Sequence, residues 1–197
     1  MKTWSMALLA VFAVALMSPA QAQQNTNVRG AVTSFDGKLI TIKSRQGADI
    51  EVGLPESVNV SITQAFTLAD IKPGTVLGVT TLKGADCGLY AIDVRPIPPT
   101  ANLGLSPFDL QPGSTMTNAV IEGAVASSNG QELTLNYKSG TVKVLVPPGT
   151  PMSRAAPGNR ADIKSGETIF VAARKDEAGK LVAVRVQVSK DGIRPIQ

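Results

Sequence analysis

Short stretches of the chain alternate apolar and polar residues with a period of two. In the first half this pattern covers residues 28–32, 40–42 and 50–52, where Val and Ile stand between polar neighbours. A period of two with many β-branched residues indicates half-buried strands rather than helices. Two further strands are predicted near 75–82 and 89–95, so the first half of the chain predicts five strands.

The second half of the chain repeats the first at an offset of 92 to 93 positions. Three segments recur in order: VRGAVTSFDGKLITIKSRQGADIEVGLP (28–55) as IEGAVASSNGQELTLNYKSGTVKVLVP (121–147), ADIKPGTVLGV (69–79) as ADIKSGETIFV (161–171), and LYAIDV (89–94) as LVAVRV (181–186). So many ordered matches indicate an internal duplication. The second copy therefore predicts its last two strands near 167–174 and 181–188.

The turns and the repeated hexapeptide indicate that each copy closes into a barrel. The Asp-Gly pair at 36–37 and the Asn-Gly pair at 129–130 tolerate the positive φ of a tight hairpin between the first two strands. Leu68 and Ile71 stand three apart, so one helical turn points both at the same apolar surface. A turn that plugs a five-stranded barrel between its third and fourth strands is the layout of an OB-fold. An open sandwich of the same strands is the alternative.

These elements predict an all-β fold class, with two tandem small OB-like five-stranded barrels from an internal duplication, each with a short helical turn. The first OB-like repeat is predicted at 25–99, a Pro/Gly-rich linker at 100–116, and the second OB-like repeat at 117–197. The prolines and glycines of the linker exclude long regular structure there.

Residues 1–22 have the features of a cleaved signal peptide. Lys2 precedes an apolar run at 6–17 that is too short to span a bilayer, and an Ala-Gln-Ala cleavage site follows at 20–22. The sequence therefore predicts a periplasmic or secreted protein without a later transmembrane segment. Cys87 is the only cysteine, so no internal disulfide is expected, although pairing with another molecule stays open.

The chain resembles a bacterial exported protein family of unknown function with tandem OB-like β-barrel domains. The resemblance rests on VRGAVTSFDGKLITIKSRQG (28–47), LADIKPGTVLGV (68–79) and FDLQPGSTMTNAVI (108–121), and it extends over nearly all of the chain after the signal peptide. It implies export and the barrel fold, and it brings no activity, cofactor or catalytic residue with it. Relatives are expected to carry Trp and His near the linker, whereas ANLGLSPFDL (101–110) has neither.

The residue types predict no catalytic or metal site, no cofactor and no enzyme. The chain has no histidine, which removes the Ser/His and Cys/His pairs that activate a nucleophile. Borderline metals prefer His and Cys ligands, of which the chain offers a single Cys. The sequence marks out no pair of carboxylates for glycoside hydrolysis.

Charge separates the two repeats. Residues 25–99 carry seven basic and seven acidic side chains, whereas 116–197 carry eleven basic and seven acidic ones. The second repeat therefore offers a basic face to a polyanion such as an acidic glycan or a phospholipid headgroup. The alternative is an ordinary solvated surface. Seven residues are the candidate polyanion-binding site: Arg154, Arg160, Lys164, Arg174, Lys175, Lys180 and Arg185.

The leading functional hypothesis is an exported, non-enzymatic binding or interaction module that engages an unknown envelope protein or polyanionic ligand. Export and a shortage of aromatic side chains for base stacking disfavour nucleic acid. Two alternatives stay open: an accessory subunit or weak hydrolase of the cell envelope, and an envelope stress protein that binds small ligands.

Overall fold

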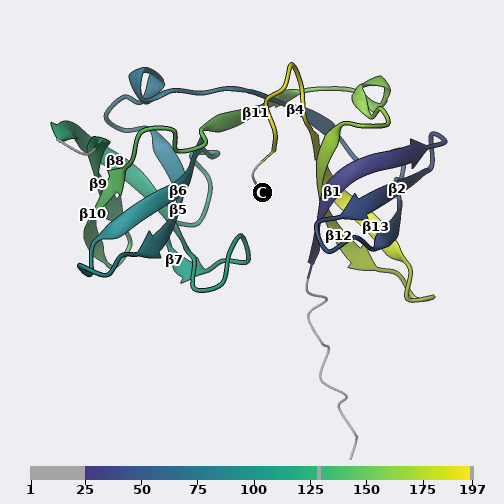
Figure 1. Cartoon of the computed structure of the whole chain (residues 1–197), viewed down its shortest axis with the longest axis horizontal. Helices are drawn as coiled ribbons and strands as arrows, with labels where there is room; N and C mark the ends of the chain where they lie inside the picture. Colours follow the sequence, from purple (N-terminus) through teal and green to yellow (C-terminus); the bar gives the residue numbers. More distant parts are fainter. Residues whose placement is uncertain (1–24, 128–129, 196–197) are drawn as a thin grey trace, which may run out of the picture.

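The computed structural model describes residues 25–127 and 130–195. The predicted signal peptide and Asn129 of the predicted hairpin turn lie outside the described residues. The described part of the chain is nearly all β, with two short 3₁₀ turns and two closed five-stranded barrels side by side (Figure 1). The predicted all-β fold with two small barrels is confirmed.

One barrel is built from the two ends of the chain and is called the end barrel here. Its strand order is β1-β2-β3-β13-β12, and β12 closes the barrel by pairing with β1. All neighbours are antiparallel except β3 and β13, which run parallel where Gly53 meets Val182. Its five strands are β1 (Thr26–Phe35), β2 (Leu39–Ser44), β3 (Asp49–Gly53), β12 (Thr168–Lys175) and β13 (Leu181–Val188).

The other barrel comes from a continuous stretch in the middle of the chain and is called the central barrel. Its strand order is β8-β9-β10-β6-β5, closed by β5 pairing with β8, and β10 runs parallel to β6. Each barrel thus has the order first-second-third-fifth-fourth that an OB-fold has. The strands are β5 (Val76–Lys83), β6 (Leu89–Pro96), β8 (Thr115–Ser127), β9 (Gly130–Tyr137) and β10 (Gly140–Val146), and β7 (Gly104–Pro107) pairs with the outer edge of β8.

The pairing corrects the predicted domain boundaries, because the two repeats exchange strands. The prediction gave one barrel to residues 25–99 and one to 117–197. Instead, the first three strands of each repeat close with the last two strands of the other repeat. The central barrel is consequently inserted in the chain between the two parts of the end barrel.

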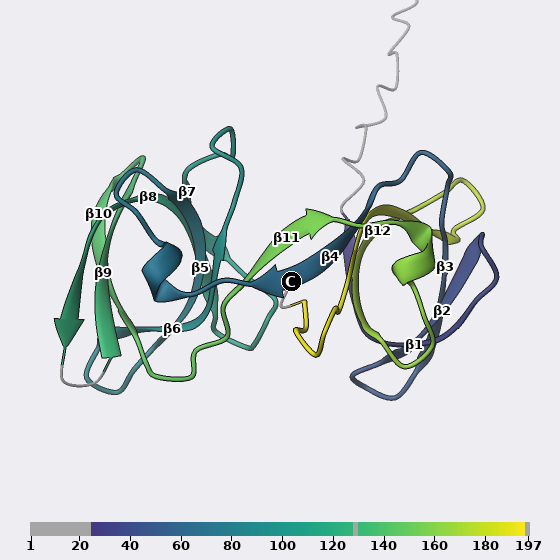
Figure 2. The same ribbon diagram turned by 90° about the horizontal axis from the view of Figure 1, so that it is seen from above.

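Two extended arms explain the exchange. After its third strand, each repeat continues as an arm that crosses to the other barrel, β4 (Val60–Ala65) in the first repeat and β11 (Ser153–Pro157) in the second. The arms pair antiparallel with each other between the barrels, as Figure 2 shows from above. β4 also runs parallel to β13, where the Thr63 hydroxyl donates to the Val188 carbonyl at 3.1 Å. Prolines flank the arms and favour extended backbone over a tight reversal.

The repeated hexapeptide forms the plug that the sequence predicts. Each copy plugs the barrel that contains the first three strands of the other repeat. The 3₁₀ turn η1 (Leu68–Asp70) packs Leu68 against the core of the central barrel, whereas η2 (Arg160–Asp162) precedes Ile163, which is buried in the end barrel. Both turns start with a capping box. The backbone N–H of the N-cap residue, Thr67 or Asn159, donates at 2.9 Å to the aspartate three positions later.

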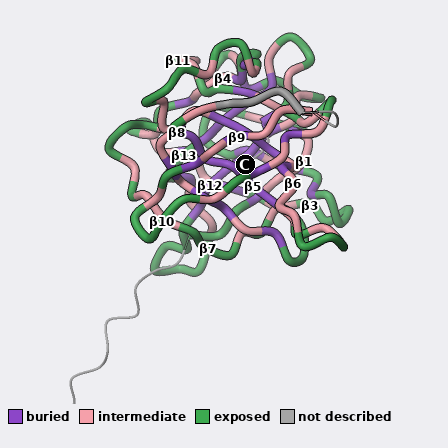
Figure 3. Tube along the Cα trace, turned by 90° about the vertical axis from the view of Figure 1, so that its left-hand side faces the viewer, coloured by how far each residue is buried: buried purple, intermediate pink, exposed green. Residues whose placement is uncertain are grey.

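Each barrel has its own aliphatic core, so the exchange fixes which side chains share an interior. Figure 3 shows the buried positions concentrated along the strands and the exposed ones at the turns. The core of the end barrel combines Val32 and Ile42 of the first repeat with Val171 and Val186 of the second, all at most 2% exposed. In this structure the strands of each repeat are buried against strands of the other.

The first strand of the second repeat is also shifted from its predicted alignment. In the end barrel Val32 pairs with Ile42, and in the central barrel Ile121 pairs with Leu135. Ile42 and Leu135 are equivalent in the repeat, so Val32 corresponds to Ile121, four residues away from the sequence alignment. The longer β8–β9 hairpin accommodates the shift.

The exchange is tested by two cysteine pairs in a Cys87→Ser background, which removes the exposed free thiol. Ala31 lies opposite Thr168 across the exchanged β1–β12 pair. In a barrel made from one repeat, Val76 would take the place of Thr168. We expect A31C/T168C to form an intramolecular disulfide on oxidation and A31C/V76C to stay reduced, as read by mass spectrometry of non-reduced peptides. The reverse result would show that each repeat closes its own barrel.

The register shift is tested by two glycines that the sequence aligns. A Cβ on Gly30 would lie 2.0 Å from the Lys43 carbonyl oxygen, whereas a Cβ on Gly123 has nothing within 4 Å. Gly30→Ala should lower the free energy of unfolding by about 1–3 kcal/mol or more, because the backbone must move. Gly123→Ala should change it by less than about 0.5 kcal/mol. Equal losses in urea titrations would contradict the different environments of the two glycines.

Candidate ligand cleft between the barrels

A cleft of about 740 Å³ lies where the two barrels face each other. One wall belongs to the end barrel, through β1, β2 and the C-terminal turn. The opposite wall is made by β6 of the central barrel, the start of β11, and the loop after β7. The cleft is therefore formed by the placement of the two barrels side by side.

The wall of the end barrel is basic. Lys43 faces out of β2, whose alternate residues Ile42 and Ser44 are buried. Arg45 starts the next turn, which is fixed where the Ser44 hydroxyl accepts the backbone N–H of Ala48 at 3.1 Å. Lys43 lies 3.4 Å from the Asp49 carboxylate in an exposed ion pair, and such pairs contribute little and are screened by salt.

A tight C-terminal turn brings a third cation to the cleft. The backbone groups of Lys190 and Ile193 exchange two hydrogen bonds at 3.2 and 2.9 Å. Between them, Asp191 and Gly192 both have positive φ, as a type I′ turn requires. This turn places Arg194 at the edge of the cleft. No hydrogen bond or ion pair holds the Arg45 or Arg194 guanidinium within the described part of the chain.

The opposite wall is mainly apolar. Ile92 of β6 lines the cleft next to Met152, and Val94 holds this region in place by donating its N–H to the Pro151 carbonyl at 3.1 Å. Leu110 adds a further apolar side chain from the loop after β7. The two walls thus differ in chemistry, with cations on one and hydrocarbon on the other.

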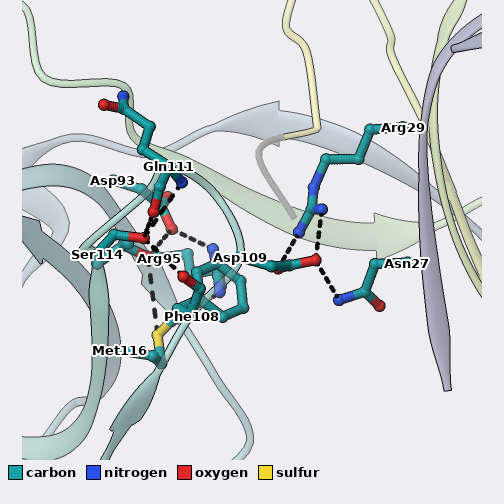
Figure 4. Close-up of polar contacts among 10 residues, drawn as sticks. Asn27, Arg29, Asp93, Arg95, Phe108, Asp109, Gln111, Ser114 and Met116 are labelled. Atoms are coloured by element: carbon teal, nitrogen blue, oxygen red, sulfur yellow. Dashed lines mark hydrogen bonds and ion pairs between the residues drawn. The ribbon is translucent and has the colours of Figure 1, made fainter. Parts of the chain in front are cut away.

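The loop after β7 is a strap (residues 108–114) that ties the central barrel to the end barrel. Its own shape is set by the Ser114 hydroxyl, 2.9 Å from the Phe108 carbonyl. Asp109 reaches across and accepts two hydrogen bonds from Arg29 at 2.8 and 2.9 Å and one from Asn27 at 3.1 Å (Figure 4). The Arg29 bonds are the main reason that the pKa of Asp109 is lowered from 3.8 to about 2.

Arginines and phenylalanines alternate beside this clamp and join the barrels. The Arg29 guanidinium lies 5.3 Å from the Phe170 ring centre and 5.8 Å from that of Phe108. Arg185 lies over the Phe170 ring at 5.2 Å, and Arg95 lies over the Phe108 ring at 5.5 Å. Cation–π contacts of this length are favourable, most of all away from water. Together with Asp109 they hold the strap between the barrels.

The stack of alternating residues Arg185, Phe170, Arg29, Phe108 and Arg95 is called the Arg–Phe ladder here. It ends in a buried ion pair. Arg95 donates to Asp93, which is fully buried and also accepts from the Thr80 hydroxyl at 3.1 Å. Burial raises the pKa of the Asp93 carboxyl, and the Arg95 guanidinium opposes that shift. The Asp93 Oδ1 and Arg95 Nε atoms have no protein hydrogen-bond partner. Arg95 of this pair contacts Phe108 of the strap, and neither Asp93 nor Arg95 lines the cleft.

The structure places the seven basic residues predicted from the sequence on several elements, and it brings Arg174 and Arg185 to the lining of one hollow. Arg160 donates to the carbonyls of Gly37, Leu54 and Pro55, so it fastens η2 to the other repeat. Arg185 stacks on Phe170. The remaining members lie on three elements: Arg154 on the arm β11, Lys164 after η2, and Arg174, Lys175 and Lys180 on the β12–β13 hairpin.

The basic residues of the cleft were missed by sequence reasoning. Lys43 and Arg45 belong to the repeat that is neutral overall, and Arg194 stands far away at the other end of the chain. No motif connects them, because only the exchange of strands brings them together.

The described residues contain no group of three or more His, Cys, Asp or Glu side chains placed to hold a metal. None of their helical segments is long and apolar enough to cross a membrane. Comparisons with protein-family models, curated proteins and solved structures give no match to this chain.

The clamp between Asp109 and Arg29 makes stability depend on pH. The pKa of Asp109 in the folded protein is lowered to about 2. The contribution of its ionised carboxylate to the free energy of unfolding is therefore present above about pH 4 and is lost as the pH falls toward 2. The Asp109 side chain is 51% exposed, so we discount the contribution to about 1 kcal/mol. Asp109→Asn should lower the free energy of unfolding by that amount at pH 7, and the two proteins should converge near pH 2.

Urea titrations at several pH values make this measurement, with Asp49→Asn as the matched control. Asp49 has only an exposed ion pair, so its substitution should change the free energy of unfolding by less than about 0.5 kcal/mol. A difference between wild type and Asp109→Asn that stayed constant from pH 7 to pH 2 would show that the clamp is not ionic.

Proposed function

We propose that the protein is an exported binding module that takes up an anionic ligand in the cleft between its two barrels. The observation that carries the proposal is the lining of the cleft. Lys43, Arg45 and Arg194 face it, and none of the other described lining residues is acidic. A pocket with one sign of charge and low-dielectric walls concentrates ligands of the opposite sign.

The distribution of charge between the barrels supports the same ligand class. The described parts of the end barrel and its turns, residues 25–54 and 158–195, carry twelve Lys and Arg against eight Asp and Glu. The central barrel and its strap, residues 67–150, carry five against six. An approaching anion is therefore attracted to the side of the cleft where the three cations stand.

Binding fits the cleft better than catalysis does. Among the described residues that line it there is no carboxylate, histidine or cysteine, and these are the groups that most often act as general base or nucleophile. Its volume of about 740 Å³ falls within the roughly 300–1,000 Å³ typical of sites for small molecules.

The test compares two charge-neutralised variants for binding of pyrophosphate and of heparin by isothermal titration calorimetry. We expect R45Q/R194Q to weaken pyrophosphate binding by about tenfold or more, since two cations at the site are lost. Affinity for pyrophosphate should fall as salt is raised. The matched control is R174Q/K175Q/K180Q on the β12–β13 hairpin, which should leave pyrophosphate binding unchanged.

The two variants also decide between the cleft and the basic surface predicted from the sequence. Loss of heparin and pyrophosphate binding in the hairpin variant alone would place the anion site on the β12–β13 hairpin and would refute the cleft. Absence of pyrophosphate binding by the wild-type protein at low salt would refute the cleft as a site for small inorganic anions.

A further inference from the structure

We infer that the ligand of the cleft is an amphipathic anion, a single-chain molecule with one anionic head group and a hydrocarbon body. This inference rests on the proposed function and adds the chemical class of the ligand. It follows from the difference between the two walls, the size of the cleft and the position of its unpaired cations.

The head group has a defined place in the cleft. Arg45 lies between the cleft and a smaller neighbouring hollow of about 280 Å³, which also includes Arg29. Arg29 is already neutralised by the bidentate contact with Asp109. The guanidinium groups of Arg45 and Arg194 are therefore the ones left to bind an incoming carboxylate or phosphate, and Arg matches both in geometry.

The hydrocarbon body of the ligand would contact the opposite, apolar wall of the cleft. Ile92, Leu110 and Met152 approach the cleft from three different elements of the chain, and Pro151 extends the apolar surface. A small inorganic anion leaves this surface in water. A ligand that covers it gains the free energy of removing apolar area from water, in addition to the ionic contact.

The arrangement disfavours the other anions with similar head groups. A polyanion carries charge along its whole length, so part of it would lie against hydrocarbon without a counter-charge. A lipid in a bilayer presents its head group at a flat surface, whereas the three cations line a cleft whose lining also includes residues of the central barrel and the strap. A monomeric single-chain amphiphile can place its anionic head group at the arginines and its hydrocarbon chain against the apolar wall.

Three probes of matched structure test the inference by isothermal titration calorimetry at concentrations below micelle formation. Decanoate has the head group and the chain, acetate has only the head group, and decyltrimethylammonium has the same chain with a positive head group. We expect decanoate to bind at least tenfold more tightly than acetate and the cationic amphiphile not to bind. Vesicles of phosphatidylglycerol should not sediment the protein.

Substitutions on each wall should act differently on the two kinds of anion. I92S/L110S should weaken decanoate about tenfold and leave pyrophosphate unchanged, whereas R45Q/R194Q should weaken both. Leu105→Ser is the matched control, because Leu105 is a half-exposed leucine outside the cleft and should change neither. Thermal unfolding of each variant verifies that it is folded.

The outcomes separate this inference from the proposed function. If pyrophosphate binds through Arg45 and Arg194 but decanoate binds no better than acetate, the cleft is an anion site and the amphipathic ligand is refuted. Equal binding of decanoate and its cationic analogue would refute the role of the cations. Capture on phosphatidylglycerol vesicles without binding of monomeric decanoate would assign the surface to a membrane and would overturn the inference.

Discussion

The structure depends on one constraint: three strands of an OB-like barrel cannot close without a hairpin to pair with both of their edges. β1 and β3 present those edges in the end barrel, and β12 and β13 cover them. The arms β4 and β11 decide which hairpin arrives, because they carry each hairpin across to the opposite barrel and then pair with each other. Closure of both barrels and their placement side by side thus depend on the same crossing of the chain.

The cleft is a direct consequence of this crossing. Separate barrels on a flexible linker would share no fixed surface, since connections rich in Pro and Gly allow domains to move. Here two β arms, the strap and the Arg–Phe ladder join the barrels. The Asp109 clamp gives the strap one defined position on the end barrel, and that position sets the wall from which Leu110 and Gln111 face the cleft.

The sequence predicted the local structure well and the long-range pairing poorly. Alternating patterns located the barrel strands but not β4, β7 or β11, and the spacing of Leu68 and Ile71 located a plug, because these depend on neighbours in the chain. Which hairpin closes which barrel depends on pairing between segments far apart in the chain, such as Gly53 with Val182 in the end barrel and Tyr90 with Leu145 in the central barrel, and both choices bury the same kinds of side chain. The repeat made the two choices look equivalent. Summing charge over repeats therefore pointed to the hairpin cations and missed Lys43, Arg45 and Arg194.

The interface between the barrels explains why the cleft stays open instead of collapsing. An apolar interface would gain by burying more area, and the barrels would slide together until their surfaces met. The ladder and the clamp have directional requirements: guanidinium planes over the rings of Phe108 and Phe170, and a carboxylate in the fork of Arg29. The Nε atom of Arg29 has no protein hydrogen-bond partner, so the arrangement carries a desolvation cost. Closer approach would break these contacts and leave charge buried without a partner, which is destabilising. Directional polar contacts hold the barrels at a fixed separation, and that separation gives the cleft its width.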